Sequence, residues 1–182
     1  MLTTVVSTEV NVPVRTAYLQ WMQFEDFPKF MEGVKQVTQL DAKRLHWRAE
    51  IAGTEKEWVA KIIEQTPDKR IAWTSRGASL AEAMVTFHPL SEGKSQILLR
   101  VGYTAEGNVT HVGDGMSAVS LRMQSDLERF KAFIEKRYGE TMAGLDLKGV
   151  PHAAPRGTVH TNVRGHSRLH GSATSYAVEP VV

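Results

Sequence analysis

Three of the four tryptophans of this 182-residue chain lie within residues 44–75. Each belongs to its own strand-like run: Trp47 to RLHWRAEI, Trp58 to EKEWVAKIIE and Trp73 to RIAWTS. In the first run apolar and polar residues alternate, which is typical of a strand with one buried face. Large aromatic rings on neighbouring strands either fill a core or line a hollow. The segment therefore predicts a sheet with an aromatic face and leaves both alternatives open.

The first two of these runs are separated by the dipeptide Ala-Gly at 52–53, which predicts a tight turn. If the turn has two residues, counting places Trp47 opposite Trp58 and Arg48 opposite Glu57. An aromatic pair on one face and an opposite-charge pair on the other are favourable in a hairpin. The sequence therefore predicts an antiparallel hairpin in this register.

Similar alternation along the chain predicts an antiparallel sheet. The strands are expected at residues 3–12, 34–40, 44–51, 55–64, 70–75, 81–90 and 95–104. Two short helices are expected after the first strand, at residues 14–22 and 24–31. This order predicts an α+β domain, in which a curved antiparallel sheet of seven strands wraps around a long C-terminal helix.

That long helix is expected at Met116–Tyr138, where apolar residues recur at spacings of three and four. The pattern places Asp126 on or near its polar face and makes Gly139 a candidate cap. The preceding segment, Gly107–Gly115, is polar and glycine-rich and is expected to be a flexible loop that could gate a cavity.

Residues 145–182 have a different composition, rich in Gly, Pro, Ser, Thr, Arg and His. Because such a segment buries too little apolar surface to offset the entropy of ordering, we expect a disordered basic tail after a domain at 1–144. Its sparse basic residues allow a weak peripheral attraction to anionic lipid and predict no specific nucleic-acid binding. Its histidines match no standard zinc spacing: His152, His160, His166 and His170.

The overall composition limits the chemistry further. The chain has no cysteine, which excludes disulfides, thiolate metal sites and cysteine nucleophiles, and its net charge is only +2. No signal peptide, membrane-spanning run or phosphate-binding glycine loop is recognisable. We therefore expect a cytoplasmic protein with no cofactor and no metal.

Several segments resemble a known family: VPVRTAYLQWMQFEDFPKFMEGVKQV, LHWRAEIAG, EWVAKIIEQTPDKRIAWTSRG, VTFHPL and DLERFKAFIEKR. They are similar to bacterial polyketide cyclase/dehydrase-type proteins of the START-like, helix-grip (SRPBCC) superfamily, which also includes coenzyme Q-binding START-like proteins. The resemblance covers Thr4–Gly144. It implies the helix-grip fold and a cavity for a hydrophobic small molecule between sheet and helix, and it implies no particular reaction.

We therefore expect the protein to sequester or transport a hydrophobic ligand, such as a lipid, a quinone or an aromatic polyketide. The resemblance and the alternation together suggest a set of aromatic and apolar residues as the lining. These candidates are Trp47, Trp58, Trp73, Phe87, Leu99, Tyr103, Met116 and Met123.

Two alternatives remain open at this point. A cyclase or dehydrase would need acid–base groups inside the cavity. The titratable strand residues fall on the face opposite the aromatic one, so no catalytic residue can be named: His46, His88, Glu50, Glu57 and Glu82. The second alternative is an interaction module whose core is filled by its own side chains. A cavity of about 300 Å³ or more would disfavour that module.

Overall fold

The computed structural model describes residues 2–51, 53–76, 80–103 and 112–147 of the chain. These residues belong to one unit, Met1–Gly149. The expected tail at 145–182 lies outside the described residues, except for helical backbone up to Leu147.

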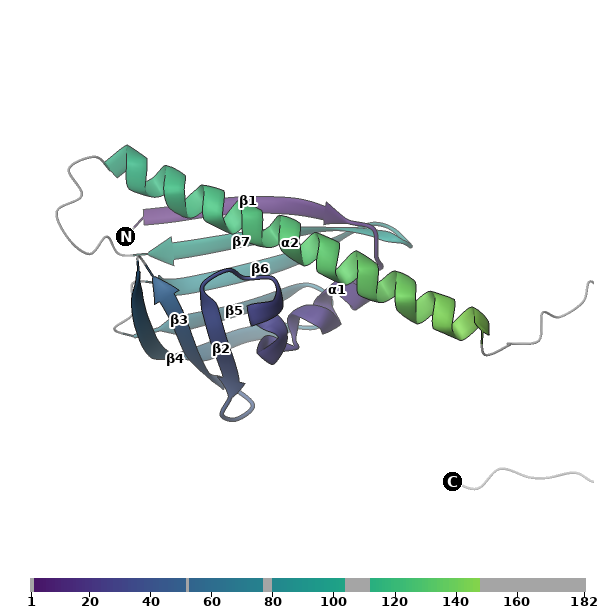
Figure 1. The fold of residues 1–182 in the computed structure, drawn as a ribbon, viewed down its shortest axis with the longest axis horizontal. Coiled ribbons are helices and arrows are strands. Elements are labelled where there is room, and N and C mark those ends of the chain that lie inside the picture. The colour runs from purple at the N-terminus through teal and green to yellow at the C-terminus, as the bar shows by residue number, and fades with distance from the viewer. Residues whose placement is uncertain (1, 52, 77–79, 104–111, 148–182) are drawn as a thin grey trace, which may run out of the picture. The chain divides into compact units, whose positions relative to one another are not determined.

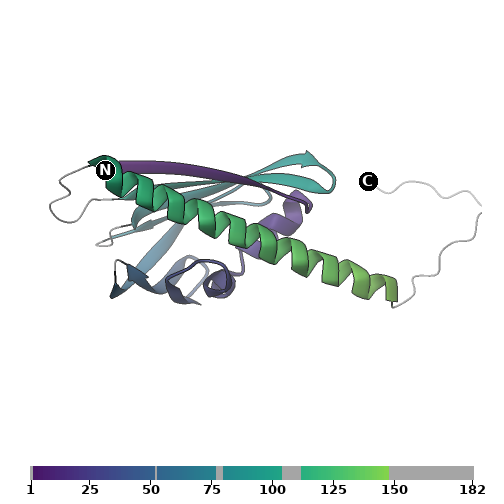
Figure 2. The same ribbon diagram turned by 45° about the horizontal axis from the view of Figure 1, so that its top comes forward.

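The order of elements matches the expected one. The elements are β1 (Leu2–Val10), α1 (Val14–Trp21), the 3-10 helix η1 (Phe24–Lys29), β2 (Val34–Gln39), β3 (Arg44–Ile51), β4 (Thr54–Thr66), β5 (Arg70–Ser75), β6 (Leu80–Ser91), β7 (Lys94–Tyr103) and α2 (Val112–Leu147). The strands form one sheet in the order β1-β7-β6-β5-β4-β3-β2, and every pairing is antiparallel. Figure 1 shows α2 lying across one face of this sheet beside β1, and Figure 2 shows the sheet curling around it. The helix-grip fold is confirmed.

The hairpin of β3 and β4 has the expected register, with Trp47 opposite Trp58 and Arg48 opposite Glu57. The expected Arg48–Glu57 ion pair is not formed, because the charged contacts run diagonally. Arg48 Nε lies 3.8 Å from Glu55, and His46 Nε2 lies 3.3 Å from Glu57.

The helix α2 is longer than expected at both ends. It begins at Val112, so Gly113 and Gly115 of the predicted loop are helical. It also continues through Gly139, which is therefore not a cap, and beyond the expected domain end at Gly144. A glycine costs a helix about 1 kcal/mol relative to alanine, so one such residue lowers helix stability without ending the helix. The remaining residues of the predicted loop, 107–111, lie outside the described part.

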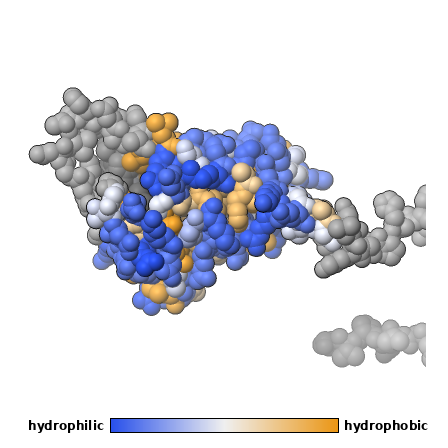
Figure 3. Space-filling model, in the orientation of Figure 1, coloured by the Kyte–Doolittle hydropathy of each residue, from blue (hydrophilic) through white to orange (hydrophobic). Residues whose placement is uncertain are grey.

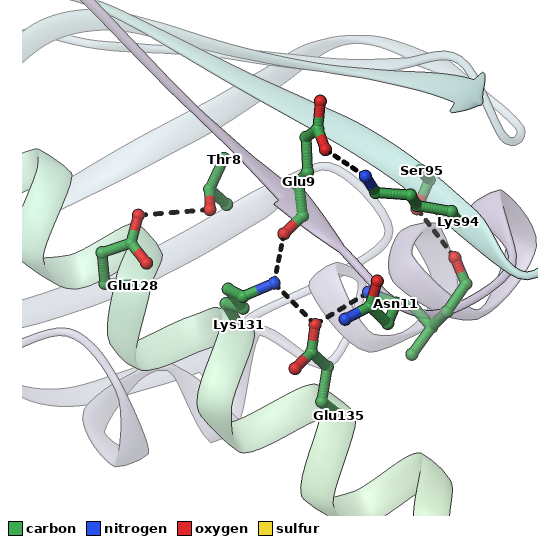
Figure 4. A network of polar contacts seen from close by, with 9 residues as sticks. Thr8, Glu9, Asn11, Lys94, Ser95, Glu128, Lys131 and Glu135 are labelled. Atoms are coloured by element: carbon green, nitrogen blue, oxygen red, sulfur yellow. Dashed lines mark hydrogen bonds and ion pairs between the residues drawn. The ribbon is translucent and has the colours of Figure 1, made fainter.

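One flank of α2 is attached to β1 by polar contacts (Figure 4). Lys131 Nζ donates to the backbone oxygen of Glu9 at 2.6 Å, and the backbone N–H of Asn11 donates to Glu135 at 2.8 Å. Two further bonds of this flank are Gln124 to the Ser7 carbonyl and the Thr8 hydroxyl to Glu128. These contacts fix the helix along the second half of the strand.

Below the second half of α2, aromatic side chains fill the space between helix and sheet. The ring of Phe130 lies 4.9 Å from the rings of Trp21 and Phe30, with interplanar angles of 68° and 69°. Leu127 and Ile134 of the same helix are fully buried beside them. We call this aromatic core the filled end.

Candidate functional site

The first half of α2 covers a cavity of about 420 Å³. This volume lies within the usual range of small-molecule sites, about 300–1,000 Å³. Its described wall comes from the loop before β2, from strands β2 to β7 and from α2. Most of the lining side chains are apolar: Met31, Val34, Trp47, Ala49, Ile51, Trp58, Trp73, Ala83, Leu99, Val101, Val119 and Met123.

The three tryptophans form a stack on the sheet side of this cavity. The ring of Trp47 is nearly parallel to the rings of Trp58 (5.9 Å, 8°) and Trp73 (6.5 Å, 18°). Ala60, two residues after Trp58 on β4, is fully buried. Trp58 is only half-buried, so the stack ends in a ring that keeps accessible surface.

Five of the eight residues expected to line the cavity do so: Trp47, Trp58, Trp73, Leu99 and Met123. Phe87 was expected there and is instead part of the filled end. Its ring contacts the rings of Tyr18 (5.6 Å) and Trp21 (6.2 Å), because β6 carries it under α1. The backbones of Tyr103 and Met116 belong to β7 and α2, and their side chains lie outside the described part.

Two polar residues of α2 also line the cavity, and the sequence pattern did not single them out. Asp126 was expected on the polar face, yet it is only 8% exposed. Arg122 lies one turn before it and is exposed. The spacing from Met123 to Asp126 is three residues, which places both on one helix face. This spacing was the sequence signal that could have placed Asp126 at the cavity.

Asp126 and two arginines bind the loop before β2, and we call these contacts the clasp. The backbone N–H of Glu32 donates to Asp126 Oδ1 at 3.0 Å, and Arg129 also donates to Oδ1. Arg129 Nε donates to the carbonyl of Phe30 at 3.0 Å, and Arg122 donates to the carbonyl of Glu32. Burial raises the pKa of Asp126, although the bonds from Glu32 and Arg129 oppose that shift.

Gly33 ties this loop to the neighbouring strand β3 by a backbone hydrogen bond. Its φ of +81° lies in the left-handed region that favours glycine, and its carbonyl accepts the N–H of Glu50 at 2.7 Å. A Cβ at this position would lie 2.9 Å from the Glu50 carbonyl oxygen. The loop is therefore held between the edge of the sheet and α2.

The other titratable residues considered from the sequence are exposed at the border of the cavity or lie outside its lining. Glu50 and Glu82 border the cavity, but both are exposed, and Glu50 lies 3.3 Å from Lys35. His46 and His88 are not among the lining residues. Within the described ranges, no group of three or more His, Asp or Glu side chains is placed to hold a metal ion.

The face of the molecule seen in Figure 3 is mainly hydrophilic, and apolar side chains are visible on it in small patches. None of the helices in the described part is long and apolar enough to cross a membrane.

Comparison with solved structures shows the same fold in proteins from bacteria. A START superfamily protein from Mycobacterium smegmatis matches with a TM-score of 0.61 and 15% identity, over 76% of this chain and 98% of that one. The Zhui aromatase/cyclase from Streptomyces sp. R1128 matches with a TM-score of 0.62 and 13% identity, over 75% and 95%.

Comparison of sequences shows a closer relationship. A Streptomyces lincolnensis protein, described as an uncharacterized 17.2 kDa protein in the melC2-rnhH intergenic region, is 44% identical over 136 residues, or 74% of this chain and 91% of its own length. Residues 10–134 match the family model "Polyketide cyclase / dehydrase and lipid transport". The chain therefore belongs to the polyketide cyclase/dehydrase and lipid transport family.

Proposed function

We propose that the protein binds an apolar small molecule in the cavity under α2 and sequesters or delivers it. The observation that carries this proposal is a cavity of about 420 Å³ with a wall of three indole rings. Burial of apolar ligand surface contributes about 25 cal/mol per Å², which suffices for binding without a charged anchor.

The lining favours a ligand with a flat or conformationally adaptable apolar body. An aromatic ring can stack on the accessible part of Trp58, which prolongs the indole stack. The flexible side chains of Met31 and Met123 can adapt to ligands of different shape. Lipids, quinones and aromatic polyketides are therefore the classes to test, and the family description supports polyketides and lipids among them.

The direct test is native mass spectrometry of the full chain purified without detergent, followed by extraction of any bound compound. We expect either a co-purified apolar ligand or uptake of at least one of a quinone, a fatty acid and an aromatic polyketide. A protein that is empty and takes up none of the three would contradict the proposal.

The Trp58→Ala variant tests the site itself. We expect the affinity for the bound ligand to fall about tenfold, because the stacking surface and its buried area are lost. Isothermal titration calorimetry measures this change, and Trp58→Phe, which keeps a ring, is the matched control. Unchanged uptake together with a stability loss of about 3–5 kcal/mol would instead make the ring an ordinary core residue.

A second candidate function is that of a cyclase or dehydrase, and Asp126 is the observation that favours it. Both of its hydrogen bonds go to Oδ1, which leaves Oδ2 without a partner among the described residues. A partly buried carboxyl with a raised pKa is suited to proton transfer at a cavity wall. If this function is correct, the protein converts a bound polyketide to a product of lower mass by water loss, and Asp126→Asn stops conversion while binding persists.

The interaction module is the least supported alternative, because it requires a filled core.

A further inference from the structure

The cavity wall is built from strands and a helix along most of its extent and from a loop at one place. Most of its described residues belong to strands, which cannot separate from one another without breaking backbone ladders, and the others on regular elements belong to α2, which is held by side-chain packing and polar contacts. Among the described lining residues, only Met31, Glu32 and Gly33 lie outside a helix or strand. This loop and the facing part of α2 form a seam along the cavity.

The ends of the loop are fixed, so its movement can stay local. Phe30, immediately before it, is buried in the filled end, and Val34, immediately after it, begins β2. On the helix side, Leu127 and Phe130 are fully buried and anchor α2. The seam can therefore open by displacement of the loop while the helix keeps its core contacts.

The seam is closed by the clasp, and most of the clasp is accessible to water. The Glu32 side chain is 71% exposed and lies 3.4 Å from Arg129, which is 40% exposed. Arg122 is exposed as well and reaches the Glu32 carbonyl. Exposed ion pairs and bonds of this kind exchange with water at small free-energy cost. They hold the loop in place without preventing transient release.

We propose that ligands enter and leave the cavity through this seam, and that the clasp of Glu32, Arg122, Asp126 and Arg129 sets the rate of exchange. The proposal rests on the proposed function, because it assigns a route to the same cavity. Gly33 is the natural pivot, since its left-handed backbone admits conformations that other residues rarely adopt.

The chain has no cysteine, so the two thiols of a double-cysteine variant are the only ones in the protein and can be cross-linked selectively. The double variant Glu32→Cys/Arg122→Cys is joined by a short thiol-reactive cross-linker across the seam. The matched control, Thr8→Cys/Glu128→Cys, joins α2 to β1 on the other flank, where the Thr8 hydroxyl donates to Glu128. Stopped-flow fluorescence of the apolar dye anilinonaphthalene sulfonate gives association and dissociation rates.

We expect the seam cross-link to slow association and dissociation together by about tenfold or more relative to the same variant without cross-linker. The dissociation constant should stay nearly constant, because a blocked route changes both rates equally. The control cross-link should leave both rates unchanged. Conversely, Arg129→Gln should accelerate both by about two- to fivefold, since it loosens the clasp. Thermal unfolding followed by circular dichroism verifies that each variant is folded.

Three outcomes would overturn the proposal. If the seam cross-link leaves the rates unchanged while the dye still binds, the route lies elsewhere and the proposed function stands. If both cross-links slow exchange equally, the whole helix must move and the seam is not the entrance. If the dye does not bind the wild-type protein, or binds the Trp58→Ala variant equally well, the cavity does not admit this apolar probe at its tryptophan wall and the route fails, while the proposed function is decided separately by the uptake of the quinone, the fatty acid and the polyketide.

Discussion

One helix covers two aromatic regions of opposite character. At the filled end, the rings of Trp21, Phe30 and Phe130 meet at steep angles, so that they occupy space in three dimensions. At the hollow end, Trp47 and the two indoles beside it are nearly parallel and form a flat wall. Aromatic content alone therefore does not decide whether a region is core or cavity, and in this protein the two regions differ in how their rings are arranged.

The carboxylates of the two ends show the same contrast. At the filled end, burial alone would raise the pKa of Asp26, but hydrogen bonds from Lys29, Gln20 and Arg137 hold it below its usual value. At the hollow end, burial dominates, and the pKa of Asp126 is raised although Arg129 binds it. The filled end thus stabilises the charge of its carboxylate, and the hollow end does not.

The largest expected difference comes from deletion of one ring at each end. Phe130→Ala should lower the free energy of unfolding by about 3–5 kcal/mol, because it leaves an unfilled void in a packed core. Trp58→Ala should cost about half of that or less, because the ring is only partly buried. Urea denaturation followed by circular dichroism measures both. Equal costs would mean that the hollow end is packed as firmly as the filled end.

The next difference comes from addition of volume. Ala17 of α1 is fully buried at the filled end, and Ala17→Leu should cost about 1–3 kcal/mol through overpacking. Ala83 lines the cavity, so Ala83→Leu should change stability little and weaken ligand binding, because its added carbons enter the free space. Denaturation and calorimetry together measure this pair. A large stability loss in Ala83→Leu with unchanged binding would contradict the comparison.

The smallest effect is the pH dependence of stability. Folded Asp126 has a pKa above its unfolded value, so its contribution to stability is present at low pH and is lost as the pH rises through that folded pKa. Asp26 has a lowered pKa and behaves oppositely, so its contribution is lost as the pH falls. Between about pH 3 and pH 6, the stability of wild type relative to Asp126→Asn should therefore decrease, and relative to Asp26→Asn it should increase. Urea denaturation at a series of pH values measures both slopes, and slopes of the same sign would refute the assignment.

The alternation of residues was sufficient to predict the strands and the pairing of Trp47 with Trp58, because strand periodicity and turn length are local properties. The burial of Asp126 and the position of Phe87 were not predictable in this way. Both depend on where α1 and α2 cross the sheet, and that crossing is set by packing between elements distant in sequence. The loop at 31–33 was missed for a related reason, since a segment between two elements has no periodicity to read.

The attachment of α2 to β1 has a consequence for the behaviour of the protein at high concentration. β1 is the terminal strand of the sheet, and a terminal strand exposes backbone groups that another chain can pair with. Gln124 and Lys131 bond the carbonyls of Ser7 and Glu9 on this strand, and Glu135 accepts the N–H of Asn11 immediately after it. The helix therefore takes the place of a neighbouring strand and protects this edge against aggregation through intermolecular strand pairing.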